Sequence, residues 1–296
     1  MKKLFGRFRK KKSWGNEVML PEMERSHDEN TKHMAEADQV DPVNDLLACA
    51  SSQSIGLQRE KNEDSLFKIC ASINSDGQLI PFGIFVVADG MGGHQHGELA
   101  SAAAVEKFIE ITVKEVYGPE LREETLKPVD ELEEIVGGAV RKANQHVYDQ
   151  APGGGTTLTA AVIHGNSVTI AHIGDSRAYL YTPERKLTLM TSDHSLVNKL
   201  VEIGQITKRQ AETHPQRNIL LRALGNDINP EVDVCTREFP ENCAILLCSD
   251  GMWGVVPEQK IVEILDTTPF LPEACKKLVD AANNLGGPDN ISVILV

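Results

Sequence analysis

The sequence lacks most of the features that mark a membrane, secreted or nucleic-acid-binding protein. None of its six cysteines forms a Cys-x-x-Cys pair, and a chain of this length needs no disulfides, so we expect free thiols in a reducing cytoplasm. No apolar run is long enough to cross a bilayer, and no apolar segment of a secretory signal follows the basic start. Aromatic residues make up only 5% and the net charge is −13, so we expect no nucleic-acid-binding surface.

Positive charge is scarce except at one end of the chain. The first 12 residues carry seven Lys or Arg and no acid, so the remaining residues sum to −20. Basic and large apolar residues interleave in residues 1–14, which makes this tip a candidate for peripheral contact with the inner membrane surface. A solubilising tail is the simpler interpretation. Residues 17–45 carry nine acids against Arg25 and Lys32, so the composition predicts a disordered tail over 1–45 and one folded domain over 46–296.

Strand-like and helix-like patterns alternate through the predicted domain. Apolar residues at steps of three and four predict two long helices, one with Ala102, Val105 and Val113 on its apolar face and one centred on Ala139. Two shorter helices are expected at about 257–265 and 271–285. Strands are expected at 48–56, 66–73, 79–88, 157–163, 167–173, 177–182, 244–248 and 291–296. Asp76-Gly77 favours a hairpin, and short turns between the runs over 157–182 favour an antiparallel meander.

Several carboxylates share one position in this pattern, at or near the end of a strand-like run. They are Glu63, Asp64, Asp89, Asp175, Asp250 and Asp289. A lone Asp-Gly is most often a turn residue, but carboxylates gathered at one end of a sheet stack would repel one another unless cations held them. Oxygen ligands without clustered His or Cys favour Mg²⁺ or Mn²⁺ over zinc. A two-metal centre of this kind suits attack by water on a phosphoryl group.

Asp89 and Arg59 stand out in this set. Asp89 follows the buried run Phe85–Ala88, and no Lys or Arg lies within ten residues before it or fifteen after it, so a metal ion is its expected partner. Arg59 stands four residues before Glu63, and a guanidinium can hold two phosphate oxygens at once. Read alone, Arg59 could equally be a surface residue.

Taken together, these motifs resemble one enzyme family. In order they are Arg59-x-x-Asn62-Glu63-Asp64-Ser65, Asp89-Gly90-Met91-Gly92-Gly93-His94-x-x-Gly97-Glu98-x-Ala100-Ser101, Gly155-Thr156-Thr157, Gly174-Asp175-Ser176-Arg177-Ala178-Tyr179, Asp193-His194-Ser195, Ser249-Asp250-Gly251-Met252-Trp253 and Gly287-Pro288-Asp289-Asn290-Ile291. Over residues 48–296 the chain resembles the metal-dependent protein serine/threonine phosphatases, the protein phosphatase 2C or PPM family, of the bacterial type. The individual motifs are short, but their combination is highly specific.

The resemblance implies an α+β fold, a four-layer α-β-β-α sandwich of two mostly antiparallel sheets flanked by helices. It also implies a role for each acidic position. The core site would hold two Mn²⁺ or Mg²⁺ ions, with Asp89 bridging them. Glu63 and the Gly90 carbonyl would serve one ion, and Asp250 and Asp289 the other. Asp175, with Asp250, would match a third, weaker site.

The same resemblance implies how catalysis would run. Arg59 would bind the substrate phosphate and Asp64 would hold a metal-bound water. Arg59, Asp64 and Asp89 would thus be the catalytic residues. The nucleophile would be the bridging water or hydroxide, so no phosphoenzyme forms.

The chain departs from animal members of the family at one position. They carry a His directly after the Asp-Gly, proposed as the general acid, whereas Met91 stands there. His94 is nearby but not at that position, so the general acid is unassigned, and metal-bound water could do the job. Gly155-Thr156-Thr157 is no phosphate-binding P-loop, because it lacks Gly-Lys-Ser/Thr, and we expect a structural role. Asp193-His194-Ser195 opens a segment similar to the family's flap, at about 194–225. We expect His194 to be structural.

Three functions are compared. The main hypothesis is a cytoplasmic, monomeric phosphatase that acts on phosphoserine and phosphothreonine proteins, including a cognate Ser/Thr kinase, and reverses kinase signalling. The alternative is a catalytically silent phosphoprotein-binding module of the same fold, which would have lost metal ligands; the sequence has lost none. A two-metal nuclease is disfavoured by the acidic composition.

Overall fold

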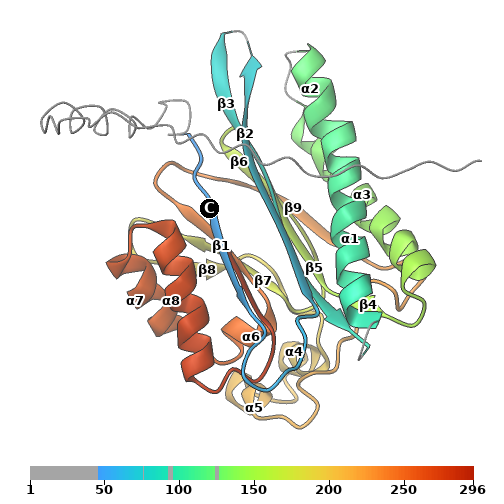
Figure 1. The fold of residues 1–296 in the computed structure, drawn as a ribbon, viewed down its shortest axis with the longest axis vertical. Coiled ribbons are helices and arrows are strands. Elements are labelled where there is room, and N and C mark those ends of the chain that lie inside the picture. The colour runs from blue at the N-terminus through green and yellow to red at the C-terminus, as the bar shows by residue number, and fades with distance from the viewer. Residues whose placement is uncertain (1–45, 76, 93–95, 124–126) are drawn as a thin grey trace, which may run out of the picture. The chain divides into compact units, whose positions relative to one another are not determined.

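The computed structural model describes residues 46–75, 77–92, 96–123 and 127–296. The predicted tail over 1–45, Asp76 of the predicted hairpin turn and His94 lie outside the described residues. Within the described part, strands form two antiparallel sheets stacked face to face, with helices over each outer face (Figure 1). This is the four-layer arrangement that the resemblance implies.

The first sheet has five strands in the order β1-β11-β10-β7-β8. Their bounds are β1 Ala50–Ser54, β7 Arg177–Tyr181, β8 Leu187–Leu189, β10 Ala244–Cys248 and β11 Ile291–Leu295. All pairs within it are antiparallel. The first and last strands of the domain are therefore neighbours, which brings the loop after β1 beside the loop before β11.

The second sheet has six strands in the order β2-β3-β5-β6-β9, with the short β4 paired to β3. Their bounds are β2 Asp64–Ser75, β3 Gln78–Met91, β4 Gly155–Thr156, β5 Leu158–His164, β6 Ser167–Ile173 and β9 Asp233–Glu238. β2 and β3 form the long hairpin predicted from the sequence. β3 reads as a continuous apolar run because it is covered on both faces.

Helices cover the outer faces of the two sheets. α1 His96–Thr112, the π-helix η2 Val113–Tyr117, α2 Gly118–Glu123 and α3 Val129–Gln150 lie over the second sheet. α7 Glu258–Thr267 and α8 Leu271–Asn284 lie over the first (Figure 1). The short helices α4 Leu196–Glu202, α5 Lys208–Glu212 and α6 Asp250–Trp253 lie at one end of the sandwich, the lower end in Figure 1.

Three clusters of buried side chains hold the layers together. One lies between α1, α3 and the second sheet, one between α7, α8 and the first sheet, and one between the two sheets. Along β3, Ile84 and Val86 face the helices, while Phe85 and Val87 face the other sheet. That alternation continues to Asp89, whose side chain is thereby directed between the sheets at their lower end.

The predicted meander over 157–182 is wrong at its second turn. β5 and β6 pair as expected, but β7 pairs with β10 and β8 in the other sheet. Gly174 makes the crossover possible: it has φ +110°, and a Cβ there would lie 2.5 Å from Thr157 Cγ2. The crossover places Asp175 between the sheets instead of in an exposed hairpin turn.

The predicted apolar face of the first long helix is only partly right, since Val105 is buried as predicted but other members of that face are not. Ala102 is exposed and Val113 is 36% exposed, whereas Ala100, Ala104 and Phe108 are fully buried. In a regular 3.6-residue repeat Ala102 and Val113 stand on the side of the helix opposite these three residues, so the true apolar face is the alanine-rich one; the π-turn η2 begins only at Val113. The second long helix, α3, buries Ala139 as predicted, together with Leu132, Ala143 and Val147 on the same face.

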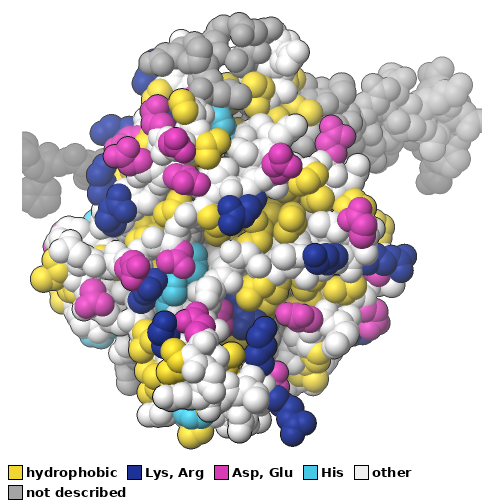
Figure 2. Space-filling model, turned by 180° about the vertical axis from the view of Figure 1, so that it is seen from behind, with side chains coloured by type: hydrophobic (Ala, Val, Ile, Leu, Met, Phe, Trp, Pro, Cys, Tyr) yellow, Lys and Arg dark blue, Asp and Glu magenta, His cyan; other side chains and the backbone are white. Residues whose placement is uncertain are grey.

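Two predictions about bonding and membranes are also tested by the described residues. All six cysteines are free thiols, as expected. Among the described residues, no helix is both long and apolar enough to cross a bilayer. On the face drawn in Figure 2, acidic and basic side chains alternate across the surface, with hydrophobic side chains emerging between them.

Candidate metal and phosphate site

Asp89 and Asp64 face each other across the first rung of a hairpin. They are register partners at the open end of the β2–β3 ladder, on the face that looks toward the other sheet. Asp64 is 7% exposed, whereas Asp89 is partly open to solvent. Two carboxylates on one rung repel unless something positive or protonated lies between them. The sequence predicted both residues for the site, and the fold brings them together.

The backbone of Asp89 is clamped by the residues that follow α3. Its N–H donates to Thr157 Oγ1 (2.9 Å), and its carbonyl accepts from the Thr157 N–H (2.9 Å) and from Thr156 Oγ1 (2.9 Å). The Gly155-Thr156-Thr157 motif therefore positions the central carboxylate. This agrees with the structural role expected for it.

Asp64 is held by the opposite sheet. Its Oδ2 accepts hydrogen bonds from Ser292 Oγ (2.6 Å) and Ser249 Oγ (2.8 Å). Ser292 lies on the same face of β11 as the buried Ile294, so it points between the sheets. Asp64 Oδ1 is buried and has no hydrogen-bond partner among the described residues. An unpartnered buried carboxylate oxygen is costly and points to a missing ligand.

The loop before β11 carries Asp289 and Asn290 into the same place. The Asn290 side chain accepts from the Glu63 N–H (2.8 Å) and donates to the carbonyls of Ile55 (2.9 Å) and Lys61 (2.8 Å). Asn290 thus binds the segment before β2 to the segment before β11. Sequence reasoning gave Asn290 no role, although it stands beside a predicted ligand.

Asp250 begins α6 next to this loop. A Cβ at Gly251 would lie 2.0 Å from the Asn290 carbonyl oxygen, so only glycine permits this close approach. Asp250 Oδ1 is the second buried carboxylate oxygen without a partner in the described residues. The two orphaned oxygens belong to the same group of acids, although Asp64 begins β2 of the second sheet and Asp250 follows β10 of the first.

Glu63 and Gly90 lie where the two loops meet the start of α1. The Gly90 N–H donates to the Glu63 carbonyl (3.2 Å), which also accepts from Ser101 Oγ (2.6 Å). A Cβ at Gly97 would lie 2.6 Å from Glu63 Oε2, so the Glu63 carboxylate packs directly on that glycine. A Cβ at Gly90 would lie 2.2 Å from the Gly97 carbonyl oxygen. The glycines of the motif therefore allow three backbone segments to converge.

Arg59 reaches into this group from its rim. Its Nη2 donates to Asp289 Oδ2 at 2.6 Å, with the two side chains 51% and 28% exposed. The hydrogen bond to Asp289, and then the negative charges of Asp289, Asp89 and Glu63, raise the pKa of Arg59 against the opposing effect of burial. Arg59 is accordingly an exposed cation that senses the charges of three of the predicted site acids.

Asp175 lies at the crossover between the sheets. It is 8% exposed, and its backbone carbonyl accepts from Trp253 Nε1 at 2.9 Å. Burial, followed by the negative charge of Asp250, raises the pKa of Asp175 well above its usual range. Both acids proposed for the third metal site are therefore close enough to sense each other's charge.

Crowding of like charges changes the acidity of the whole group. Burial raises the pKa of Asp89 well above its usual range, with further contributions from Asp64, Asp250 and Asp175. Burial raises the pKa of Asp64 to about 7, against the effect of its serine hydrogen bonds. Burial and Asp289 raise the pKa of Asp250 to about 6. A cation at this place would reverse these shifts.

The oxygen donors of this site suit hard divalent cations, although the described side chains do not surround a single cation position. Among the described residues, no three or more His, Cys, Asp or Glu side chains stand together as a ready-made metal cage. This spread agrees with the repulsion between the carboxylates and with the pairing of Asp289 to Arg59. The fit rests on donor chemistry: carboxylate and backbone oxygens, two of them buried without a partner.

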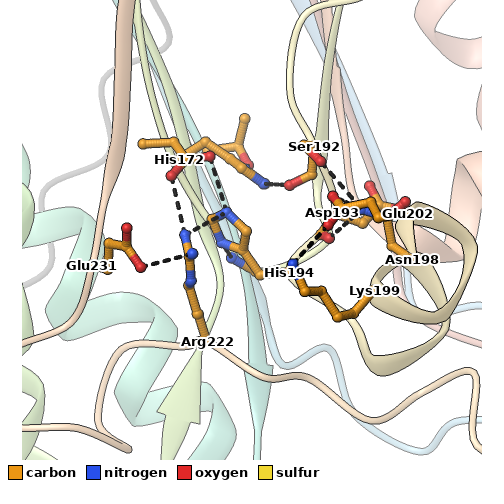
Figure 3. Close-up of polar contacts among 12 residues, drawn as sticks. His172, Ser192, Asp193, His194, Asn198, Lys199, Glu202, Arg222 and Glu231 are labelled. Atoms are coloured by element: carbon orange, nitrogen blue, oxygen red, sulfur yellow. Dashed lines mark hydrogen bonds and ion pairs between the residues drawn. The ribbon is translucent and has the colours of Figure 1, made fainter.

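His194 lies beside a hollow of about 150 Å³ at the same end of the molecule. Its Nδ1 accepts from the Gly174 N–H (3.2 Å), and its Nε2 lies 3.1 Å from Asp233 Oδ2 and 3.3 Å from Arg222 Nη1 (Figure 3). Its ring packs on His172 with centroids 4.7 Å apart. His194 thus anchors the flap segment to the crossover, in agreement with the structural role expected for it.

The family follows from comparison with known proteins. The sequence model described as "Protein phosphatase 2C" matches residues 58–283. This chain belongs to the protein phosphatase 2C family. A serine/threonine phosphatase stp of Listeria monocytogenes is 39% identical over 249 residues, which cover 81% of this chain and 92% of the relative.

Solved structures of other phosphatases share the fold. The Streptococcus agalactiae serine/threonine phosphatase matches with a TM-score of 0.69 at 30% identity, covering 84% of this chain and 98% of that one. The catalytic domain of the serine/threonine protein phosphatase PstP, solved in complex with two manganese ions, matches with a TM-score of 0.66 at 32% identity, covering 84% and 96%. In this protein phosphatase 2C member, the predicted acidic residues lie at the end of the sandwich where the loops of both sheets meet.

Proposed function

We propose that this chain is a metal-dependent phosphoprotein phosphatase that hydrolyses phosphoserine and phosphothreonine. Membership of the protein phosphatase 2C family and relatives named serine/threonine phosphatases support this activity. The observation that carries the proposal is the group of strand-end carboxylates with two orphaned buried oxygens, on Asp64 and Asp250. A silent binding module would not need such a costly arrangement, so the alternative is not favoured.

Two ions, Mn²⁺ or Mg²⁺, would be held by Glu63, Asp89, the Gly90 carbonyl, Asp250 and Asp289, and Asp175 with Asp250 would hold a third, weaker one. When bound, they activate water for attack on phosphorus and neutralise charge on the phosphate oxygens. The solved structure of the PstP catalytic domain in complex with two manganese ions supports a two-ion site.

The chain's own side chains would orient the reactants. The Arg59 guanidinium is half exposed, so it can turn from Asp289 to hold phosphate oxygens in a bidentate manner. Ser249 and Ser292 fix the Asp64 carboxylate through Oδ2 and leave Oδ1 as the acceptor that would orient the attacking water. Thr156 and Thr157 hold the Asp89 backbone in place throughout.

Activity can be tested with purified protein, p-nitrophenyl phosphate and a phosphothreonine peptide in Mn²⁺. We expect turnover that is lost with EDTA or in Asp89→Asn and retained in Asp280→Asn, an exposed control on α8. If the chelated protein were equally active, the metal mechanism would be wrong. Calorimetry that detects no Mn²⁺ binding, together with no turnover, would instead support the silent module.

We also propose a cellular setting for this activity. The enzyme would be a monomer in the cytoplasm that reverses the action of a cognate Ser/Thr kinase, with residues 46–296 as its catalytic domain. The basic residues 1–14 would contact the inner membrane surface peripherally, as the first part of a disordered tail over 1–45. Phosphoproteomics of a deletion strain tests the kinase relationship. Co-sedimentation with anionic liposomes, comparing the full chain with one lacking residues 1–45, tests the membrane contact.

A further inference from the structure

The loop that presents Arg59 is fixed to the loop that presents Asp289. The Leu57 N–H donates to the Gly287 carbonyl (2.7 Å), and the Ile55 carbonyl accepts from Asn290 Nδ2 (2.9 Å). Gly56 has φ +83°, and a Cβ there would lie 2.2 Å from the Asp289 carbonyl oxygen. The backbone on both sides of Leu57 is therefore held in one conformation beside the site.

Apolar side chains are exposed on this fixed loop and its neighbour. Leu57 is 69% exposed, Ile55 44% and Leu285 54%. A Cβ at Gly287 would lie 3.1 Å from Leu57 Cγ, so the Leu57 side chain lies against Gly287, which has no side chain to shield it from solvent. We call Ile55, Leu57 and Leu285 the Leu57 ledge. Within the described residues nothing buries the ledge, although Leu57 stands only two residues from Arg59.

We propose that the Leu57 ledge receives an apolar side chain next to the phosphorylated residue of a protein substrate. The inference rests on the proposed function, because Arg59 fixes where the phosphate lies. In an extended peptide each residue advances about 3.3 Å, so a side chain one or two residues from the phosphoresidue reaches the ledge. The three ledge residues carry no charge, so Leu, Ile, Val or Phe is the favoured occupant. Because the loop is already ordered, the contact costs little entropy.

The preference can be measured with two phosphothreonine peptides that differ only in having Leu or Ser on both sides of the phosphothreonine. We expect kcat/KM for the Leu peptide to be about five- to tenfold higher, since a partly covered leucine recovers only part of its transfer free energy. Leu57→Ser should abolish this ratio without changing turnover of p-nitrophenyl phosphate. Phe270→Ser is the matched control: Phe270 is 65% exposed at the other end of the 14-residue α8, about 20 Å from Leu285.

Binding of the same peptides with a phosphonate in place of the phosphate, followed by fluorescence anisotropy, separates this inference from the activity. Tighter binding of the Leu peptide, lost in Leu57→Ser and kept in Phe270→Ser, supports the ledge whether or not turnover occurs. Equal binding of both peptides, or a preference that survives Leu57→Ser combined with Leu285→Ser, overturns it. A dimer in light scattering that Leu57→Ser dissociates also overturns it, since a second copy would then be the occupant. Absence of p-nitrophenyl phosphate turnover in the wild type counts only against the phosphatase activity.

Discussion

The guanidinium of Arg177 lies over the indole ring of Trp253, 3.4 Å from its centroid. The same guanidinium forms two hydrogen bonds with Asp193, from Nε to Oδ1 (2.9 Å) and from Nη2 to Oδ2 (2.7 Å). Trp253 in turn donates to the Asp175 carbonyl. Arg177 therefore connects the start of the flap segment, at Asp193, with the helix that begins at Asp250.

Replacing Arg177 with Met should destabilise the protein by about 2–4 kcal/mol, because Asp193 would keep a largely buried charge without its partner. The two side chains are only 19% and 10% exposed. Urea denaturation followed by tryptophan fluorescence measures the change. Lys276→Met is the control: its pair with Asp280 is 74% and 52% exposed, so the loss should stay below about 0.5 kcal/mol. Equal effects of the two substitutions would show that Arg177 is not a structural link.

Ser292→Ala should lower both stability and turnover, because it removes a 2.6 Å hydrogen bond to the buried carboxylate of Asp64. A hydrogen bond to a charged group contributes about 1.5–3 kcal/mol. Turnover of p-nitrophenyl phosphate at saturating Mn²⁺ should fall about tenfold, since the Asp64 carboxylate loses one of its two supports. Ser167→Ala removes a 2.9 Å hydrogen bond at the turn between β5 and β6, at the other end of these strands, and serves as the control. Wild-type turnover in Ser292→Ala would separate Asp64 from catalysis.

Arg59→Lys should impair substrate binding while leaving stability unchanged. The Arg59–Asp289 pair is exposed, so it contributes little to folding. A lysine keeps the charge but cannot hold two phosphate oxygens in the fork geometry of a guanidinium. We expect KM for a phosphothreonine peptide to rise about tenfold with the melting temperature within a degree or two of wild type. Should KM stay constant in Arg59→Lys and in Arg59→Ala, another group binds the phosphate.

The sequence was sufficient to predict the strand-end acids and most strands, because those depend on local patterns. Asp89 and Asp250 each follow a buried run and Asp64 precedes a strand-like run, and the fold gathers them. The supports of these acids could not be predicted in the same way. Ser292 is an ordinary strand residue until β11 is placed opposite β2, and nothing local marks it as the partner of Asp64.

Two of the predictions were wrong, wholly or in part, for the same physical reason: contacts between residues far apart in the sequence overrode a local sequence pattern. The turn at Gly174 has the composition of a hairpin turn, yet the strand after it finds its partner, β10, in the other sheet. The helix beginning at His96 carries apolar residues on more than one face, yet packing against the second sheet and α3 buries the face of Ala100, Ala104 and Phe108 and leaves Val113 exposed. In both cases tertiary packing decided between alternatives that the sequence alone left equivalent.

His172 should make the protein less stable as the pH falls below neutral. Burial, together with the neighbouring His194, lowers the pKa of His172 to about 3, and the Ser192 carbonyl and Asp233 oppose this only in part. Its Nε2 donates to the Ser192 carbonyl (3.1 Å), and Nδ1 lies 2.9 Å from Thr159 Oγ1, which suits a neutral ring.

The sign follows from the lowered pKa. In the unfolded chain the ring takes up a proton near pH 6.5, while the folded protein resists protonation down to about pH 3. Its contribution to stability is therefore complete above about pH 6.5 and is lost progressively as the pH falls toward 3. Between pH 7.5 and 5.5 the loss should be about 1.4 kcal/mol.

Urea denaturation of the wild type and of His172→Gln across this range measures the loss of stability. The variant should lose less stability than the wild type by that amount, whereas His146→Gln, a change on α3 that keeps His172, should follow the wild type. Parallel curves for the wild type and His172→Gln would mean that His172 is not held neutral in the folded protein.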